Sequence, residues 1–201
     1  RVKKNIKSIS CEIRKQSPDI TMIQEVDKDS RRSYHINQVK KLENSIRGSE
    51  YSYARNYKAA FVPYPMPPLG KMDSGIMTIS RFKADSSKRV SLPVSFTWPV
   101  RTVNLKRCLL VSRTKVEGTG KELVYINLHL EAYDKGAGKK AQTRALNRIL
   151  KKEASKGNYV IAAGDFNQTF NNVDINEYKV RKGLWKPGII DISDYDSSLN
   201  F

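Results

Sequence analysis

The sequence has no long hydrophobic run: none of its apolar segments approaches the roughly 18 residues that a helix needs to cross a bilayer. The first residues, Arg1 to Asn5, lead into an amphipathic pattern rather than an apolar stretch, so the chain does not start like a signal peptide. The first residue is not Met, which is compatible with the removal of an upstream segment. The compartment therefore stays open.

Cysteine and histidine are scarce, with two of each. Cys11 falls in a helical pattern and Cys108 in a strand pattern, and neither has a metal-ligating residue at close spacing. This distribution favours two buried thiols, with a single disulfide as the alternative.

Acidic residues are few beside the basic ones, 20 against 37, which gives a net charge of +17. The basic residues are scattered in pairs rather than gathered in a tail, so we expect a charged face on a folded domain. Such a surplus favours a polyanionic partner, namely nucleic acid, anionic lipid headgroups or phosphorylated small molecules. A generally basic surface is the alternative.

The 201 residues, 39% of them hydrophobic, can bury one sizeable core, and neither a repeat nor a linker divides them. We therefore expect residues 1–201 to form a single domain. Apolar periodicity predicts helices over Val2–Ile13, Ile36–Ile46 and Ala137–Ala154. It predicts strands over Ile20–Val26, Tyr51–Val62, Gly75–Ser80, Val90–Val94, Leu105–Val116, Leu123–Leu130 and Val160–Ala163. Gly118 and Gly120 mark a hairpin turn, and the proline-rich segment from Pro63 to Pro68 must be an exposed loop.

Polar side chains recur at the ends of these predicted strands. The run Val160–Ala163 suits a strand buried on both faces, and Asp165 and Asn167 follow it, two positions apart and on the same side. Glu25 and His129 end two other strands. Each has a structural interpretation as well: an Asx turn for Asp165 and Asn167, an acid that faces water, and a hydrogen-bonded structural histidine.

The segments around these residues resemble motifs of the endonuclease/exonuclease/phosphatase superfamily, the group of DNase I. The matching segments stand in family order: Pro18-Asp19-Ile20 through Gln24-Glu25-Val26, Ser74-Gly75-Ile76 through Ser80-Arg81-Phe82, Asn127-Leu128-His129-Leu130 and Gly164-Asp165-Phe166-Asn167. A helix that carries Gln142 and Arg144 lies between the last two. The resemblance covers about residues 6–167.

The resemblance implies an α+β fold of the DNase I type, a four-layer sandwich of two packed mixed β-sheets flanked by helices. It also implies a Mg²⁺-dependent hydrolase of phosphoester bonds, with Mn²⁺ or Ca²⁺ as alternative cations. Glu25 matches the metal-binding glutamate, a hard oxygen ligand. His129 matches the histidine that hydrogen-bonds the scissile phosphate. Asp165 matches the acid that positions the attacking water or shares the metal, and Asn167 the amide that holds a phosphate oxygen.

Two parts of the family pattern have no counterpart in the sequence. The first strand, which should precede Val2, and the closing Ser-Asp-His motif, which should follow about residue 170, are both missing. The chain therefore looks like a family domain truncated at both ends. Loss of the general base typically costs about 10²–10⁴-fold in rate, so we expect the printed chain alone to be inactive or weakly active and its parent protein to be an active hydrolase.

The leading functional prediction is a phosphodiesterase, specifically a nuclease, because counterion release would give a basic protein non-specific affinity for DNA. A phosphatase of inositol phosphates or a sphingomyelinase-like lipid phosphodiesterase is the first alternative. In that case Tyr64 and Met66 of the proline-rich loop would contact a membrane. A non-catalytic basic binding module is the second alternative. Arg107 either reaches a phosphate or faces solvent, and a monomer is expected.

Overall fold

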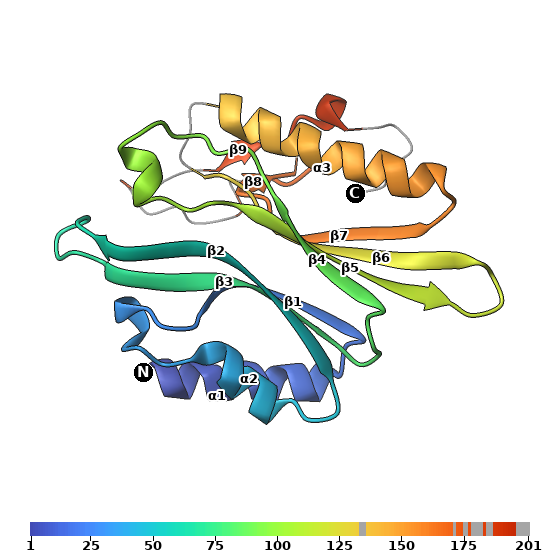
Figure 1. Ribbon diagram of the computed structural model, residues 1–201, viewed down its shortest axis with the longest axis horizontal. Coiled ribbons are helices and arrows are strands. Elements are labelled where there is room, and N and C mark those ends of the chain that lie inside the picture. Colours follow the sequence, from blue (N-terminus) through green and yellow to red (C-terminus); the bar gives the residue numbers. More distant parts are fainter. Residues whose placement is uncertain (133–135, 171, 175–176, 178–182, 184–186, 196–201) are drawn as a thin grey trace.

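The computed structural model describes residues 1–132, 136–170, 172–174, 177, 183 and 187–195. The helices are α1 Val2–Gln16, α2 Gln38–Ser45 and α3 Ala137–Ser155, with short 3₁₀ turns at Arg31–Ser33, Val100–Thr102 and Ile192–Asp194. The strands are β1 Ile20–Asp27, β2 Glu50–Val62, β3 Gly70–Ser80, β4 Ser86–Ser91, β5 Cys108–Val116, β6 Lys121–His129, β7 Tyr159–Asp165, β8 Gln168–Thr169 and β9 Gly188–Ile189. The described residues thus form an α+β fold with three α-helices (Figure 1). Among the described residues, no helix is long and apolar enough to span a membrane.

The first half of the chain builds a three-stranded antiparallel sheet in the order β1-β3-β2. Helices α1 and α2 cover one face of it (Figure 1). Ile6 of α1 and Leu42 of α2 pack there against Met77 and Ile79 of β3. Helix α1 ends as expected, because Ser17 takes a left-handed conformation just before Pro18.

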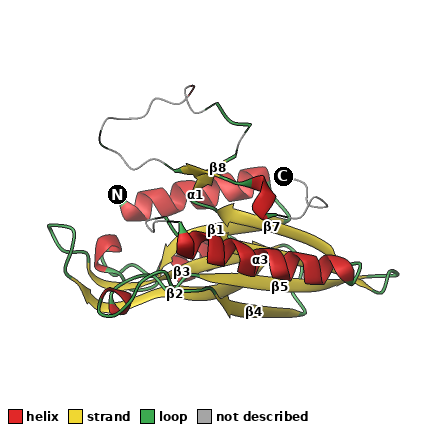
Figure 2. Cartoon of the chain, turned by 90° about the horizontal axis from the view of Figure 1, so that it is seen from above, coloured by secondary structure: helices red, strands yellow, loops and turns green. Residues whose placement is uncertain are grey.

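The second half builds a four-stranded sheet in the order β4-β5-β6-β7, in which only β6 and β7 run parallel. Helix α3 connects these two strands and runs along them (Figure 2). It buries Leu146 and Leu150 against Val124, Ile126 and Leu128 of β6. The hairpin between β5 and β6 confirms the turn predicted from Gly118 and Gly120, both of which have positive φ angles.

Strand β7 corrects one expectation. The run Val160–Ala163 was predicted to be buried on both faces, but β7 is an edge strand that pairs only with β6 among the described residues. Val160 and Ala162 pack on the α3 core, whereas Ile161 on the opposite face is 49% exposed. The apolar run misled because small residues suit a half-buried edge as well as a central strand. Cys11 is likewise exposed, not buried, and both thiols are free.

The two sheets pack face to face through a small apolar cluster of Ala54, Ile76, Cys108 and Leu110. Among the polar residues that join them, Asn127 of β6 is fully buried, donates to the carbonyl of Met77 at 2.9 Å and accepts from the amide of Gln24 at 2.8 Å. Buried polar groups need such partners, so these bonds fix how the sheets lie against each other. The ends of β1 and β6 are thereby brought to the same place.

Candidate active site

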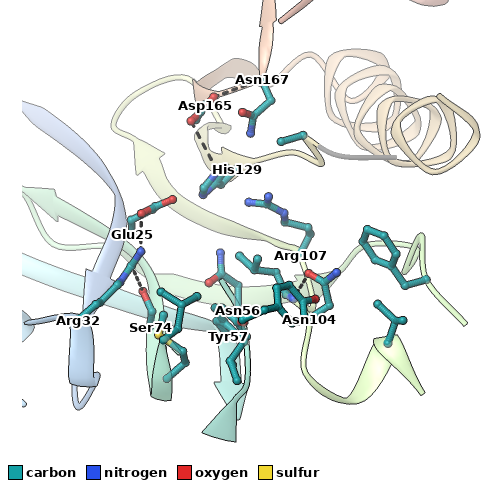
Figure 3. A pocket seen from close by; sticks show the side chains of 18 of the residues that line it. Glu25, Arg32, Asn56, Tyr57, Ser74, Asn104, Arg107, His129, Asp165 and Asn167 are labelled. Atoms are coloured by element: carbon teal, nitrogen blue, oxygen red, sulfur yellow. Dashed lines mark hydrogen bonds and ion pairs between the residues drawn. The ribbon is translucent and has the colours of Figure 1, made fainter. Parts of the chain in front are cut away.

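A pocket of about 500 Å³ opens where the two sheets meet (Figure 3). The four residues predicted from the sequence, Glu25, His129, Asp165 and Asn167, all line it. They come from β1, from the end of β6 and from the segment that ends β7 and follows it. The expected convergence of these side chains is therefore found.

Glu25 leaves the ladder of β1 at a bulge. Its φ angle is 56°, and the pairing of β1 with β3 shifts between Ile23 and Val26. A bulge re-aims a side chain that regular pairing would point elsewhere. The Glu25 carboxylate, 57% exposed, consequently faces the pocket from the three-stranded sheet. A left-handed conformation at a residue other than glycine costs about 1 kcal/mol, which marks the position as special.

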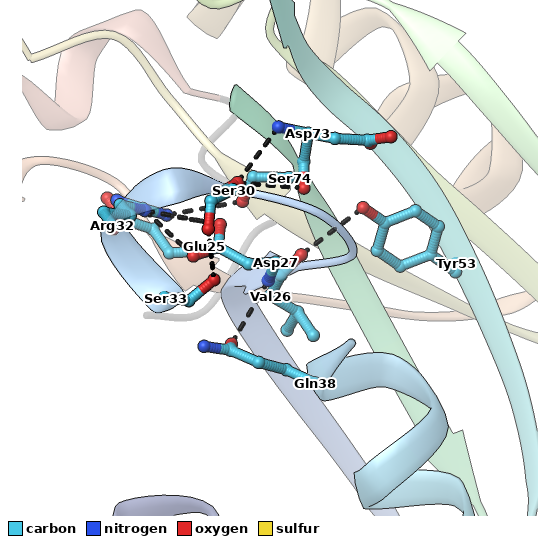
Figure 4. Close-up of polar contacts among 10 residues, drawn as sticks. All are labelled: Glu25, Val26, Asp27, Ser30, Arg32, Ser33, Gln38, Tyr53, Asp73 and Ser74. Carbon is cyan, nitrogen blue, oxygen red and sulfur yellow. Dashed lines mark hydrogen bonds and ion pairs between the residues drawn. The ribbon is translucent and has the colours of Figure 1, made fainter. Parts of the chain in front are cut away.

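Arg32 holds this carboxylate in place (Figure 4). It donates to Glu25 at 2.8 Å through Nη1, and to both oxygens of the buried Asp27 at 3.0 and 3.1 Å through Nη2 and Nε. Burial disfavours the charged guanidinium, but the bonds to Asp27 outweigh it and raise the pKa of Arg32. The sequence prediction missed Arg32 and Asp27. The sequence does carry a signal that would have indicated them, namely the acid pair at positions 25 and 27 followed by a basic residue at position 32.

His129 lies opposite Asp165 because parallel pairing of β6 and β7 aligns these two residues. Its side chain is 4% exposed, with Nε2 3.6 Å from Oδ2 of Asp165. Burial and the nearby Arg107 cation lower the pKa of His129 to about 4, against the pull of Asp165. The imidazole is therefore neutral near pH 7, and none of the described residues forms a hydrogen bond with its Nδ1.

Asp165 and Asn167 form a turn and line the pocket at the same time. The backbone N–H of Asn167 donates to Oδ1 of Asp165 at 2.8 Å, and the Asn167 side-chain amide donates to the carbonyl of Leu130 at 2.9 Å. Asn167 has a φ angle of 51°, which asparagine tolerates better than most residues. The Asx turn and the site are thus one feature: the turn fixes the Asp165 carboxylate, 49% exposed, toward the pocket.

Arg107 and Asn56 supply donors that sequence reasoning did not settle. Arg107 is 3% exposed, so it does not face solvent, and its Nε and Nη1 have no partner at hydrogen-bond distance among the described residues. Glu131 lies 3.7 Å from Nε, and burial lowers the pKa of the guanidinium. The side-chain amide nitrogen of Asn56, likewise buried, also has no hydrogen-bond partner in the part of the chain that the structure describes. Figure 3 shows both side chains turned toward His129 and Glu25.

Unsatisfied buried donors on this scale call for an explanation, because a buried N–H without a partner costs about 1–3 kcal/mol. A ligand that offers acceptor oxygens, such as a phosphate, would satisfy Arg107 and Asn56 together. Positive charge and neutral donors therefore face two carboxylates, Glu25 and Asp165, across one pocket. This arrangement suits an anionic ester whose oxygens need donors on one side and whose reaction needs carboxylates on the other.

The pocket offers some, but not all, of the ligands that a divalent metal ion needs. Among the described residues, no group of three or more His, Cys, Asp or Glu could hold a metal ion. Glu25 and Asp165 are hard oxygen donors on the same pocket, and only Oε2 of Glu25 is bonded to Arg32. Mg²⁺ commonly takes one or two carboxylates and keeps several waters, so this donor set is compatible with it.

The described residues define an α+β protein with a pocket between two sheets, lined by both basic and acidic side chains. A profile of the Endonuclease/Exonuclease/phosphatase family matches residues 5–196, and the chain belongs to that family. Members of this family are phosphoester hydrolases and typically use a divalent metal. A search of curated proteins found no significant match.

Solved structures agree on the fold. An endonuclease/exonuclease/phosphatase from Beutenbergia cavernae shares 23% identity at a TM-score of 0.63, and the match covers 82% of this chain and 42% of that one. A mannosyl-6-phosphatase from Bacteroides thetaiotaomicron shares 18% at 0.60, with 84% and 58% covered. TDP2 from D. rerio, complexed with single strand DNA product, shares 18% at 0.55, with 85% and 54% covered. The chain therefore spans about half the length of these relatives.

Proposed function

We propose that this chain carries most of the active site of a metal-dependent phosphodiesterase that acts on nucleic acid. The observation that carries the proposal is the pair of buried, unsatisfied donors, Arg107 and Asn56, that face Glu25 and Asp165 across the pocket. The net charge of +17 favours a polyanionic substrate. A distant structural relative, TDP2, is seen with single strand DNA product.

In this proposal Arg107 and Asn56 bind the non-bridging oxygens of the phosphate. The Asp165 carboxylate, held by the Asx turn, orients the attacking water, whose proton passes to the general base of the Ser-Asp-His segment proposed below. The water oxygen bonds to phosphorus as the bond to the leaving oxygen breaks. Neutral His129 hydrogen-bonds a phosphate oxygen, since its lowered pKa keeps it uncharged near pH 7. Glu25 and Asp165 would hold Mg²⁺, with Mn²⁺ or Ca²⁺ as alternatives, and the cation would neutralise developing charge.

We also propose that the complete domain is a four-layer sandwich with one further strand before α1 and a Ser-Asp-His segment after residue 201. The coverage of the relatives, 42% to 58% in the two cited hydrolases, supports this. The free outer edge of β7 among the described residues supports it too. The complete reading frame would test it, and a stop directly after Phe201 would contradict it.

The activity test uses the full-length protein with Mg²⁺ and three substrates: supercoiled plasmid DNA, a bis-aryl phosphate diester and an aryl phosphate monoester. We expect plasmid nicking and diester cleavage, with Asp165→Asn slower by about 10²–10⁴-fold. Asp19→Asn is the matched control, because this carboxylate is 80% exposed and lies outside the pocket. Equal nicking by wild type and Asp165→Asn would refute the assignment of the site.

Anion binding is tested separately from catalysis. Inorganic phosphate should raise the melting temperature of the wild-type protein, because a ligand of the native state stabilises it by RT ln(1 + [L]/Kd). Arg107→Met should remove this shift, whereas Arg101→Met, an exposed arginine before β5, should keep it. A shift that survives Arg107→Met would place the anion elsewhere.

A lipid phosphodiesterase is the second candidate, and one observation favours it. Exposed apolar side chains lie in the two loops that contribute residues to the pocket: Tyr64 is 51%, Met66 83% and Trp98 80% exposed. Tyr64 lines the pocket together with Phe96 and Val100, so the loops before β3 and β5 meet there. Co-sedimentation with sphingomyelin or phosphoinositide vesicles, set beside a DNA mobility shift, separates the two. A non-catalytic basic module would instead show no metal binding that depends on Glu25, as measured by titration calorimetry with Mg²⁺.

A further inference from the structure

A second, strongly basic groove lies between α1 and α2. Its volume is about 380 Å³, and it shares no lining residue with the pocket described above. These helices cover the face of the three-stranded sheet that points away from the second sheet (Figure 1). The groove is lined by Lys3, Ile6, Lys7, Ser10, Arg14, Lys41, Asn44 and Ser45.

The basic residues form one continuous stripe. Lys3, Lys7 and Arg14 follow one another at helical spacing on α1, and Lys41 faces them from α2. At 1.5 Å rise per residue, the stripe extends about 16 Å along α1. No acidic residue of the described ranges lines the groove. Among the described residues, neither the three lysines nor Arg14 forms an ion pair with a carboxylate.

The floor and one wall of the groove add further observations. Ser10 is 1% exposed, and its hydroxyl has no hydrogen-bond partner within the described ranges of the chain. An acceptor oxygen that enters the groove would satisfy this donor. Arg14 is fixed by one bond, from Nη1 to the carbonyl of Ser45 at 2.8 Å, which orders its guanidinium beside the groove. A site with ordered donors loses less entropy when a ligand binds than one made of mobile lysines alone.

We propose that the α1–α2 groove binds the phosphate backbone of a nucleic acid strand. Four cations spread over about 16 Å suit a chain of phosphates better than a single small anion. A membrane surface is the weaker match, because Ile9, 46% exposed, is the one large exposed apolar side chain of these two helices. Binding to membranes at an interface uses a wide apolar face as well as charge. The groove would position nucleic acid and take no part in the chemistry.

The test measures binding without cleavage. A fluorescent 20-nucleotide strand is titrated with the full-length protein in EDTA, and anisotropy is recorded over a range of salt concentrations. The groove variant combines Lys3→Gln, Lys7→Gln and Lys41→Gln. Each lost phosphate contact should lower the slope of log K against log salt by about 0.7–0.9, so we expect a reduction of about 2–3. Affinity at 0.1 M salt should fall by about tenfold or more.

The matched control removes the same charge elsewhere, through Lys83→Gln, Lys88→Gln and Lys115→Gln, three exposed lysines near β4 and β5. The control should leave the slope nearly unchanged. Equal losses in both triple variants would overturn the proposal in favour of diffuse charge. Selective loss of binding to anionic phospholipid vesicles, with unchanged oligonucleotide binding, would overturn it in favour of a membrane.

Two further readouts keep the result separate from the proposed catalytic function. Thermal melts of both triple variants should match that of the wild type, since these lysines are exposed. Cleavage of the small bis-aryl diester should be unchanged in the groove variant, because the groove lies outside the pocket. Full oligonucleotide binding by a protein that cleaves nothing would contradict the catalytic proposal and leave the groove assignment intact.

Discussion

Glu153 makes acid stability a direct test of the structure. Near the end of α3, this carboxylate is 5% exposed and accepts hydrogen bonds from Arg113 at 3.0 Å, Asn158 at 2.9 Å and Lys156 at 3.2 Å. Burial alone would raise its pKa, but these bonds outweigh burial and lower the pKa from 4.5 to about 2. By linkage, a difference of this size contributes about 3 kcal/mol to the free energy of unfolding.

The sign of this contribution sets the pH window. Because the pKa of Glu153 is lower in the folded chain, the stabilisation is complete above about pH 4.5 and is lost as the pH falls toward 2. Glu153→Gln, which removes the charge, should therefore be less stable than the wild type by about 3 kcal/mol at pH 7. About half of this difference should remain at pH 3.

Urea unfolding followed by far-UV circular dichroism at pH 7, 5, 4 and 3 measures this difference. Glu117→Gln, an exposed acid in the β5–β6 turn, is the control and should track the wild type at every pH. A deficit of Glu153→Gln that is equal at pH 7 and pH 3 would refute the reasoning. It would mean that the loss comes from shape or packing rather than from the ionised carboxylate.

Two further predictions concern the frame that holds the site. Asn127→Ala should lower the free energy of unfolding by about 2–3 kcal/mol, because it removes the hydrogen bonds to Gln24 and Met77 and leaves a small cavity. Chemical denaturation measures this difference. A loss below about 0.5 kcal/mol would contradict the role of Asn127 in joining the two sheets. Gly164→Ala should cost about 3 kcal/mol or more, because Gly164 has a φ of 144° and an added Cβ would lie 2.1 Å from the carbonyl oxygen of Leu128. A Gly164→Ala protein with an unchanged melting temperature would show that β6 and β7 approach less closely than described.

Sequence reasoning found the parts of the site that local pattern encodes. Asp165 and His129 lie at strand ends, and a polar residue that follows an apolar run can be recognised from the sequence alone. The bulge that turns Glu25 inward was not predictable, because it depends on how β1 pairs with β3. Nor was the burial of Arg107, since a basic residue before a strand looks the same in sequence whether it faces water or a pocket.

The position of β7 at the edge of its sheet was not predictable for a related reason. Val160 and Ala162 pack on α3, while Ile161 points outward, so alternation exists but the apolar outward residue hides it. The apolar residues of a strand indicate which of its faces can be buried, but not whether the strand pairs with other strands on one side or on both. Neighbours of a strand are set by chain topology, which requires knowing where distant segments lie.

The side-chain hydrogen bond between Gln24 and Asn127 has a consequence for how this member of the family would respond to a ligand. Gln24 is adjacent to Glu25, and Asn127 is two residues from His129, so this hydrogen bond helps to set the spacing between the two walls of the pocket. A sliding movement of one sheet over the other would widen or narrow the distance between these walls. A ligand that contacts both walls would link the two sheets across the pocket and would stabilise the folded chain, because it binds only the native state.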